Sequence, residues 1–172
     1  MSMTQVAFLK KADLPNKTEI ENSIRQLGYE FEILDNFENF YGIDGLECKI
    51  NEQKTFFEIY FEEPSEITND FEFIKKDLTD QDTAVSFIWG DDYAAGASIG
   101  LISVALIDKC NAQIYYLDDE MAYSKEMLLA DTPEFLNELK KQKKYAEKNQ
   151  NTESKVHPKR NSFWNRIKNL FE

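Results

Sequence analysis

The stretch SFIWGDDYAAGASIGLISVALID, residues 86–108, constrains the fold more than any other part of the chain. Residues 93–107 carry no charge, but this run is shorter than the roughly 20 apolar residues that a transmembrane helix needs. The GDDYAAG segment matches neither glycine-rich phosphate fingerprint, and two aspartates at a helix N-terminus would repel phosphate. We therefore predict a buried core helix over residues 93–109, capped by Asp91 or Asp92.

Apolar segments that favour β-strands flank this predicted helix. TAVSFIW (83–89) comes directly before it, and AQIYYL (112–117) comes directly after it. A strand, a helix and a strand in succession form a β-α-β unit, whose two strands are parallel and end at the same edge of the sheet. The unit would thus bring together five acidic residues, which we call the acidic rim: Asp91, Asp92, Asp118, Asp119 and Glu120.

The remaining patterns predict an α+β domain around this unit. Asn16 and Glu19 have capping-box spacing at the start of a helix, and Gly28 stands where that helix should end. Alternating apolar residues predict four further strands, the last two forming a hairpin, at 6–9, 29–34, 46–50 and 55–61.

The C-terminal part of the domain is expected to be helical. We predict a loop over residues 118–131 and then a helix from Thr132 to residue 147, with Pro133 in its first turn. The expected domain, residues 1–148, has a mixed sheet of about five or six strands. Two main helices should cover one face of that sheet, with the C-terminal helix beside them.

The charge of the chain is unevenly distributed. Residues 1–139 contain 10 Lys and Arg against 29 Asp and Glu, a net charge of −19, whereas residues 140–172 have a net charge of +7. A surface this acidic repels nucleic acid and suits a basic protein partner. For the acidic rim, three interpretations stay open: helix caps with a solvated turn, a docking surface for a basic protein, or a divalent-metal site built from hard oxygen ligands.

Few residues in the chain are suited to catalysis. The one histidine, His157, lies in the polar tail, so a histidine-based triad within the body is excluded. Cys48 and Cys110 lie in apolar contexts and are predicted to be reduced, buried and structural. We expect a protein without catalytic activity, bound metal or cofactor. Because the segment after Met1 lacks the layout of a signal peptide, we also expect it to be cytoplasmic.

The C-terminal tail has a different character. Residues 149–161 are polar and are predicted to be a flexible linker, and residues 162–172 a short basic amphipathic helix capped by Ser162. The apolar face of that helix would contain Phe163, Trp164, Ile167, Leu170 and Phe171. Three interpretations stay open here: docking on its own domain or disorder, weak peripheral contact with a membrane, or contact with a protein partner.

Two motifs give the chain a resemblance to known proteins. FIWGDDYAAGASIGLISVALID (87–108) is followed by QIYYLDDEMAYSKEML (113–128). The chain resembles a loose group of small bacterial proteins in the order of these features: a Trp-Gly-acid entry, a small-residue helix, a strand and an acidic turn. Some of these proteins are similar to immunity proteins that neutralise toxins delivered by competing bacteria. No functional residue is carried over from the group.

The resemblance and the acidic body together predict a non-catalytic cytoplasmic binding protein. It would be an immunity protein that covers the active surface of a basic toxin domain. Two alternatives stay open. One is a small metal-dependent enzyme that uses Asp91, Asp92, Asp118 and Asp119. The other is a peripheral membrane adaptor that uses the C-terminal helix.

Overall fold

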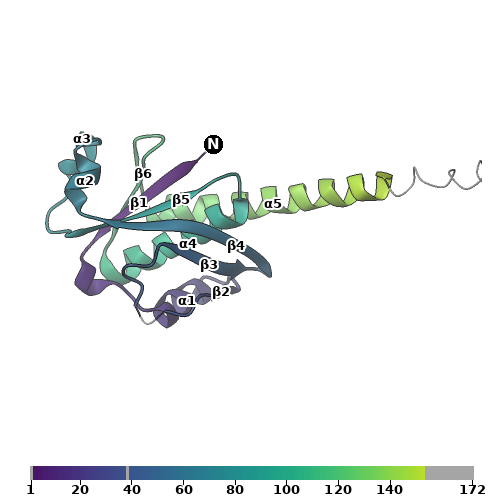
Figure 1. The fold of residues 1–172 in the computed structure, drawn as a ribbon, viewed down its shortest axis with the longest axis horizontal. Helices are drawn as coiled ribbons and strands as arrows, with labels where there is room; N and C mark the ends of the chain where they lie inside the picture. Colours follow the sequence, from purple (N-terminus) through teal and green to yellow (C-terminus); the bar gives the residue numbers. More distant parts are fainter. Residues whose placement is uncertain (1, 38, 154–172) are drawn as a thin grey trace, which may run out of the picture. The chain divides into compact units, whose positions relative to one another are not determined.

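The computed structural model describes residues 2–37 and 39–153 (Figure 1). The chain divides into two compact units, one ending at Leu136 and the other beginning at Asn137. The first unit contains a seven-stranded sheet with the order β2-β3-β4-β5-β1-β6-β7. The strands are β1 (Met3–Leu9), β2 (Phe31–Ile33), β3 (Gly45–Ile50), β4 (Gln53–Glu62), β5 (Thr83–Trp89), β6 (Gln113–Tyr116) and β7 (Met121–Tyr123).

The helices comprise one short 3-10 turn and five α-helices in the described residues. They are η1 (Lys11–Asp13), α1 (Lys17–Gln26), α2 (Pro64–Thr68), α3 (Glu72–Lys75), α4 (Tyr93–Cys110) and α5 (Lys125–Glu153). The predicted α+β class is therefore confirmed. Two details of the predicted sheet are wrong. It has seven strands rather than five or six, and it is antiparallel throughout the described residues rather than mixed.

The two strands of the β5-α4-β6 unit are parallel to each other but do not pair with each other. β5 and β6 run in the same direction, as predicted, but β1 lies between them and is antiparallel to both. Met3 stands opposite Trp89 and Gln5 stands opposite Tyr116, so both strands end near the start of β1. The prediction that β5 and β6 end at the same edge of the sheet is thus confirmed.

Helix α4 is the predicted core helix. Its residues from Ala94 to Leu106 are all buried, and Asn111 ends it in a left-handed conformation with φ of 52°. By length and hydropathy it is the one helix in residues 2–37 and 39–153 that would suit a membrane span. However, 78% of that window is buried inside the protein, as in the core helix of a folded domain.

The N-terminal helix and the β3-β4 hairpin also form as predicted. In α1 the Asn16 side chain accepts a hydrogen bond from the Glu19 backbone N–H (3.0 Å), and Oε2 of Glu19 accepts one from the Asn16 backbone N–H (2.8 Å). Gly28 follows the helix with φ of +91°, a conformation that glycine adopts without strain. The hairpin turns at Asn51 and Glu52, which both have positive φ.

The two faces of the sheet are covered by different elements. Gln5 points to the inner face, where its Nε2 donates a 2.6 Å hydrogen bond to Ser103 on α4. The alternate residues of β1 point to the outer face and form a second core with α3. Its buried members are Val6, Phe8, Ile74, Ala84 and Tyr115, and residues of the α2–α3 region pack against them. Helical cover is therefore present on both faces, and α1 packs beside α4 on the inner one.

The region after β6 differs most from the prediction. Part of the expected loop is strand β7, and α5 begins at Lys125 rather than Thr132. Pro133 consequently lies inside the helix instead of in its first turn. The Ser124 side chain accepts a hydrogen bond from the Met127 backbone (3.2 Å), which provides the N-terminal cap.

The C-terminal end of α5 also differs from the expected boundary. The helix continues to Glu153, so the first five residues of the predicted linker, 149–153, are helical. The remainder of that linker lies outside the described residues. So does the predicted amphipathic helix with Phe163, Trp164, Ile167, Leu170 and Phe171.

Candidate partner-binding surface

The structure brings both parts of the acidic rim to the same edge of the sheet. Asp118, Asp119 and Glu120 lie in the turn between β6 and β7. The backbone N–H of Thr4 donates a 2.7 Å hydrogen bond to Oδ2 of Asp118. Thr4 is paired with Ile88, near the end of β5 that leads to Asp91 and Asp92. The β5-α4-β6 connection therefore gathers the five residues as expected.

Two of the five rim carboxylates have structural roles. Oδ1 of Asp92 accepts hydrogen bonds from the Ala94 and Ala95 backbone N–H groups (2.8 and 3.3 Å), so Asp92 is the cap of α4. Its other oxygen accepts a 2.5 Å hydrogen bond from Thr55 Oγ1. Asp118 is similarly used to fix the start of β1. For these two residues, the interpretation as caps and turn residues is the better one.

The other three rim carboxylates are available to a partner. Asp91, Asp119 and Glu120 are exposed, and no ion pair to any of them occurs in the described part of the chain. Unpaired carboxylates at an exposed edge produce a negative potential that attracts a basic protein.

The described residues of the acidic rim are not arranged as a metal site. Within residues 2–37 and 39–153, no group of three or more His, Cys, Asp or Glu side chains is arranged to hold a metal ion. The two cysteines, Cys48 and Cys110, are free and buried, as predicted. Burial raises the pKa of both thiols to about 12, so they stay protonated at neutral pH and are poor nucleophiles.

The sequence analysis missed an exposed aromatic surface on the outer face of the sheet. Phe56 and Tyr60 on β4 are 58% and 45% exposed, and Ile88 on β5 is partly exposed on the same face. We call these three residues the aromatic face. The TFFEIYF segment contains the signal. Because Phe57 and Ile59 point into the core, the alternation of a strand directs Phe56 and Tyr60 toward solvent.

Local contacts hold the aromatic face against the sheet. A Cβ atom on Gly45 would lie 2.5 Å from Cζ of Phe56, so the absence of a side chain there lets the ring lie on the backbone. Tyr60 donates a 2.8 Å hydrogen bond to Oε2 of Glu58, and this bond raises the pKa of the Tyr60 hydroxyl. Glu47 is paired with Phe56 across the hairpin. The aromatic face therefore lies among carboxylates.

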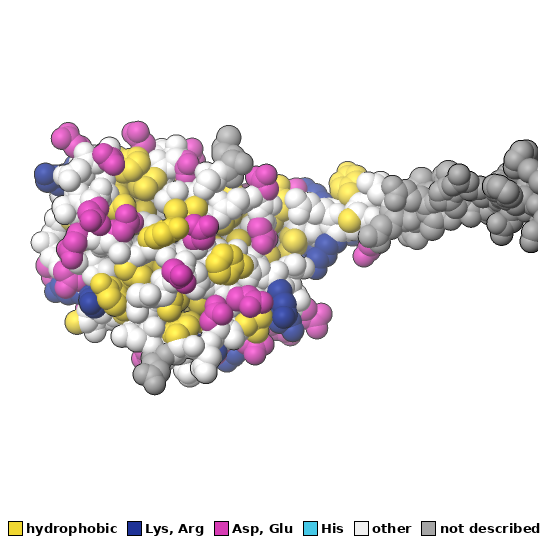
Figure 2. Space-filling model, in the orientation of Figure 1, with side chains coloured by type: hydrophobic (Ala, Val, Ile, Leu, Met, Phe, Trp, Pro, Cys, Tyr) yellow, Lys and Arg dark blue, Asp and Glu magenta, His cyan; other side chains and the backbone are white. Residues whose placement is uncertain are grey.

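The aromatic face and the acidic rim lie toward the same end of the sheet. Thr55, which bonds to Asp92, is the chain neighbour of Phe56, although its buried side chain points to the inner face. Thr4, which bonds to Asp118, is paired with Ile88. Figure 2 shows hydrophobic side chains interspersed with Asp and Glu over one face of the molecule. Both groups lie toward the end of the sheet where β5 ends, and we call the two together the docking surface.

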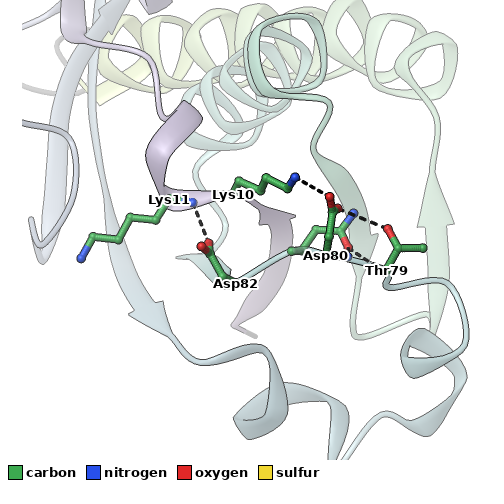
Figure 3. A network of polar contacts seen from close by, with 6 residues as sticks. Lys10, Lys11, Thr79, Asp80 and Asp82 are labelled. Carbon is green, nitrogen blue, oxygen red and sulfur yellow. Dashed lines mark hydrogen bonds and ion pairs between the residues drawn. The ribbon is translucent and has the colours of Figure 1, made fainter.

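Two aspartates near the opposite end of β1 are bound by residues of the chain itself. Lys10 forms an ion pair with Asp80, and the Lys11 backbone N–H donates a 2.7 Å hydrogen bond to Asp82 (Figure 3). The hydrogen bond from Lys10 lowers the pKa of the Asp80 carboxyl. At the rim end of the sheet, Asp91, Asp119 and Glu120 have no ion pair among the described residues.

The chain was compared with protein-family models, with curated proteins and with solved structures. None of the three comparisons found a match. The resemblance to immunity proteins thus rests on the two sequence motifs alone.

Proposed function

We propose that this chain is a non-catalytic binding protein of the immunity type. It captures a basic bacterial toxin domain in the cytoplasm and neutralises it by covering the toxin's active surface. The observation that supports the proposal is the docking surface, where exposed Phe56 and Tyr60 lie toward the same end of the sheet as the unpaired carboxylates of the acidic rim.

Each half of the docking surface supplies a different part of the interaction. Aromatic side chains are the usual anchors of protein interfaces, because they bury a large area with few rotatable bonds. The surrounding carboxylates contribute mainly to the rate of association, since they steer a basic partner toward the anchors. The net charge of −19 over residues 1–139 extends this attraction beyond the docking surface.

The neighbouring reading frames provide the test, because an immunity protein is expected beside its toxin. Each neighbour is expressed in a bacterial host, alone and together with this chain, and growth is measured. We expect one neighbour to encode a basic protein that stops growth alone and is harmless in the presence of this chain. The proposal is wrong if no neighbour is toxic, or if toxicity persists when this chain is produced.

A matched pair of variants tests the surface itself. Phe56→Thr with Tyr60→Thr removes the aromatic anchors and keeps residues that favour a strand. Tyr145→Ala removes an aromatic side chain that is 68% exposed elsewhere. Protection of the host should be lost with the first variant and retained with the second. Equal protection by both would exclude the aromatic face as the binding site.

A further inference from the structure

Five lysines lie close together in the part of helix α5 that belongs to the second unit. They fall within residues 140–149, where the one acidic residue is Glu147, and every residue of this segment is exposed. Residues 1–139 have the opposite character, with 29 Asp and Glu against 10 Lys and Arg. The segment 140–149 therefore presents a strongly positive charge to the solvent.

Four of these lysines share one face of the helix. At 3.6 residues per turn, positions i, i+1, i+4 and i+8 fall within an arc of about 100°. We call the residues at these positions the lysine stripe: Lys140, Lys141, Lys144 and Lys148. Glu138 forms an ion pair with Lys141, but neither glutamate of this region lies within the arc. At a rise of 1.5 Å per residue, the stripe is about 12 Å long.

The residues that follow α5 continue the basic character and add apolar side chains. Residues 154–172, which lie outside the described residues, contain five Lys and Arg against one Glu. The apolar residues of this segment include Phe163, Trp164, Ile167, Leu170 and Phe171. Basic residues followed by aromatic and aliphatic ones are typical of segments that bind the surface of anionic membranes.

Nucleic acid is the other polyanion that lysine-rich helices bind. Aliphatic side chains such as Ile167 and Leu170 gain little from phosphate groups, but they are stabilised when they leave water for the interface of a bilayer. The acidic residues of the chain oppose binding to either polyanion. However, charges are screened beyond about 8 Å at physiological salt, which is less than the length of the lysine stripe. The local charge of the stripe therefore determines the attraction at a membrane surface.

We propose that residues 140–172 bind the surface of membranes that contain anionic phospholipids. The ammonium groups of the lysine stripe contact the phosphates of the headgroups, and the apolar side chains of residues 163–171 enter the interface between headgroups and acyl chains. Reversible binding requires both contributions, because each is weak alone. No toxin takes part, so the proposal does not depend on the proposed immunity function.

Vesicle sedimentation with the full-length chain tests the proposal. The vesicles contain phosphatidylcholine, either alone or mixed with phosphatidylserine at a ratio of about 2:1. Sedimentation is measured in about 0.05 M and about 0.5 M sodium chloride, where screening differs strongly. We expect binding to the anionic vesicles at the lower salt concentration, release of most of the chain at the higher one, and no binding to phosphatidylcholine alone.

Two pairs of substitutions that change the net charge equally separate the lysine stripe from net charge. Lys140→Gln with Lys144→Gln removes two charges from the stripe and should weaken binding by about 30-fold, because each lysine near an anionic surface contributes about fivefold. Lys75→Gln with Lys76→Gln removes two exposed charges from the first unit and should change little.

A second matched set tests the apolar contribution. Trp164→Ala with Phe171→Ala should weaken binding by more than about tenfold, because each ring buries apolar area in the interface. Phe56→Thr with Tyr60→Thr removes two exposed rings from β4 and should change little. Circular dichroism establishes that all four variants are folded.

The proposal is overturned if the parent chain does not bind anionic vesicles at low salt, or if it binds phosphatidylcholine alone equally well. It is also overturned if the two pairs of either matched set weaken binding to the same extent. Unchanged binding after the loss of Trp164 and Phe171 would indicate a general attraction to phosphates, as in a protein that binds nucleic acid, and overturns the membrane proposal as well.

Discussion

Thr55 Oγ1 donates a 2.5 Å hydrogen bond to Oδ2 of Asp92, which joins β4 to the N-terminal cap of α4. The other Asp92 oxygen accepts hydrogen bonds from the first turn of the helix. One carboxylate thus fixes the position of the core helix relative to the strand that carries Phe56. The geometry of the docking surface depends on this residue even though Asp92 itself is committed to structure.

Asp92→Ala should lower the free energy of unfolding by about 2 kcal/mol, because it removes the helix cap and leaves the Thr55 hydroxyl without its acceptor. Asp92→Asn retains an oxygen for the cap and should cost much less. Asp91→Ala, which alters an exposed neighbour, is the control and should be nearly neutral. Urea unfolding measures all three variants, and similar losses for Asp91→Ala and Asp92→Ala would contradict the assigned roles.

Removing one partner of the buried hydrogen bond between Gln5 and Ser103 should cost more free energy of unfolding than the bond itself contributes, because the other partner is left unsatisfied. Ser103→Ala leaves the Gln5 Nε2 group without an acceptor in the core, and should lower the free energy of unfolding by about 1–3 kcal/mol. Adding Gln5→Met removes the unsatisfied donor and should recover part of that loss. A double-mutant cycle in urea measures the coupling. Strict additivity of the two substitutions would show that the bond is not formed.

The buried thiol of Cys48 should make the free energy of unfolding depend on pH above pH 9. Burial raises the pKa of Cys48 from 9.0 to about 12 in the folded chain, so folding favours the protonated thiol. The stability that results is fully present below pH 9, which is near the unfolded pKa, and is lost as pH rises toward 12. Cys48→Ala should therefore show a shallower loss of stability above pH 9 than the parent chain. Denaturant unfolding at a series of pH values provides the comparison, and identical slopes would contradict burial of the thiol.

Thiol accessibility gives an independent check of the core. Cys48 and Cys110 are both buried, and both thiols stay protonated at pH 8 because their pKa values are about 12. Alkylation with iodoacetamide at pH 8 should therefore be slow in the native chain and complete in 6–8 M urea, a range that unfolds most small domains. Mass spectrometry counts the modified thiols. Rapid labelling of the native chain would contradict the burial of Cys48 and Cys110.

Much of the fold follows from local patterns that the structure confirms. The capping box at Asn16, the alternation in the β3-β4 hairpin and the uncharged run of α4 each depend on residues close in sequence. The common edge for the acidic rim was also predictable, because a helix between two strands imposes their relative direction. The position of β1 between β5 and β6 was not, since strand order is decided by long-range packing.

The errors have equally specific causes. Proline favours the first turn of a helix, which is why the sequence predicts that place for Pro133. In α5 it lies in the interior, where it removes one backbone hydrogen bond and its ring crowds the carbonyl four residues earlier. The short helices α2 and α3 are not predicted from the sequence. Their apolar residues are buried by packing on the outer face of β1, a contact that the local pattern does not show. The aromatic face was missed because its residues alternate with core residues, and the sequence alone does not show which half of the sheet is left uncovered.

Once a partner is available, neutralising the rim should act on the rate of association. Asp91→Asn with Asp119→Asn should slow association severalfold at low salt and flatten its salt dependence, while dissociation changes little. Asp70→Asn with Glu72→Gln removes two exposed charges from another part of the body and serves as the control. Stopped-flow mixing at several salt concentrations provides the rates. Equal slowing by both pairs would assign the effect to net charge rather than to the rim.

The central claim is that the docking surface binds a basic protein, and affinity isolation from the native host tests it most directly. The tagged full-length chain is compared with its Phe56→Thr/Tyr60→Thr and Tyr145→Ala variants, and bound proteins are identified and quantified by mass spectrometry. The account predicts one basic protein, bound one-to-one to the parent chain and to Tyr145→Ala, and lost from the double variant. It is contradicted if no basic protein is bound, or if the double variant retains as much of that protein as the parent chain.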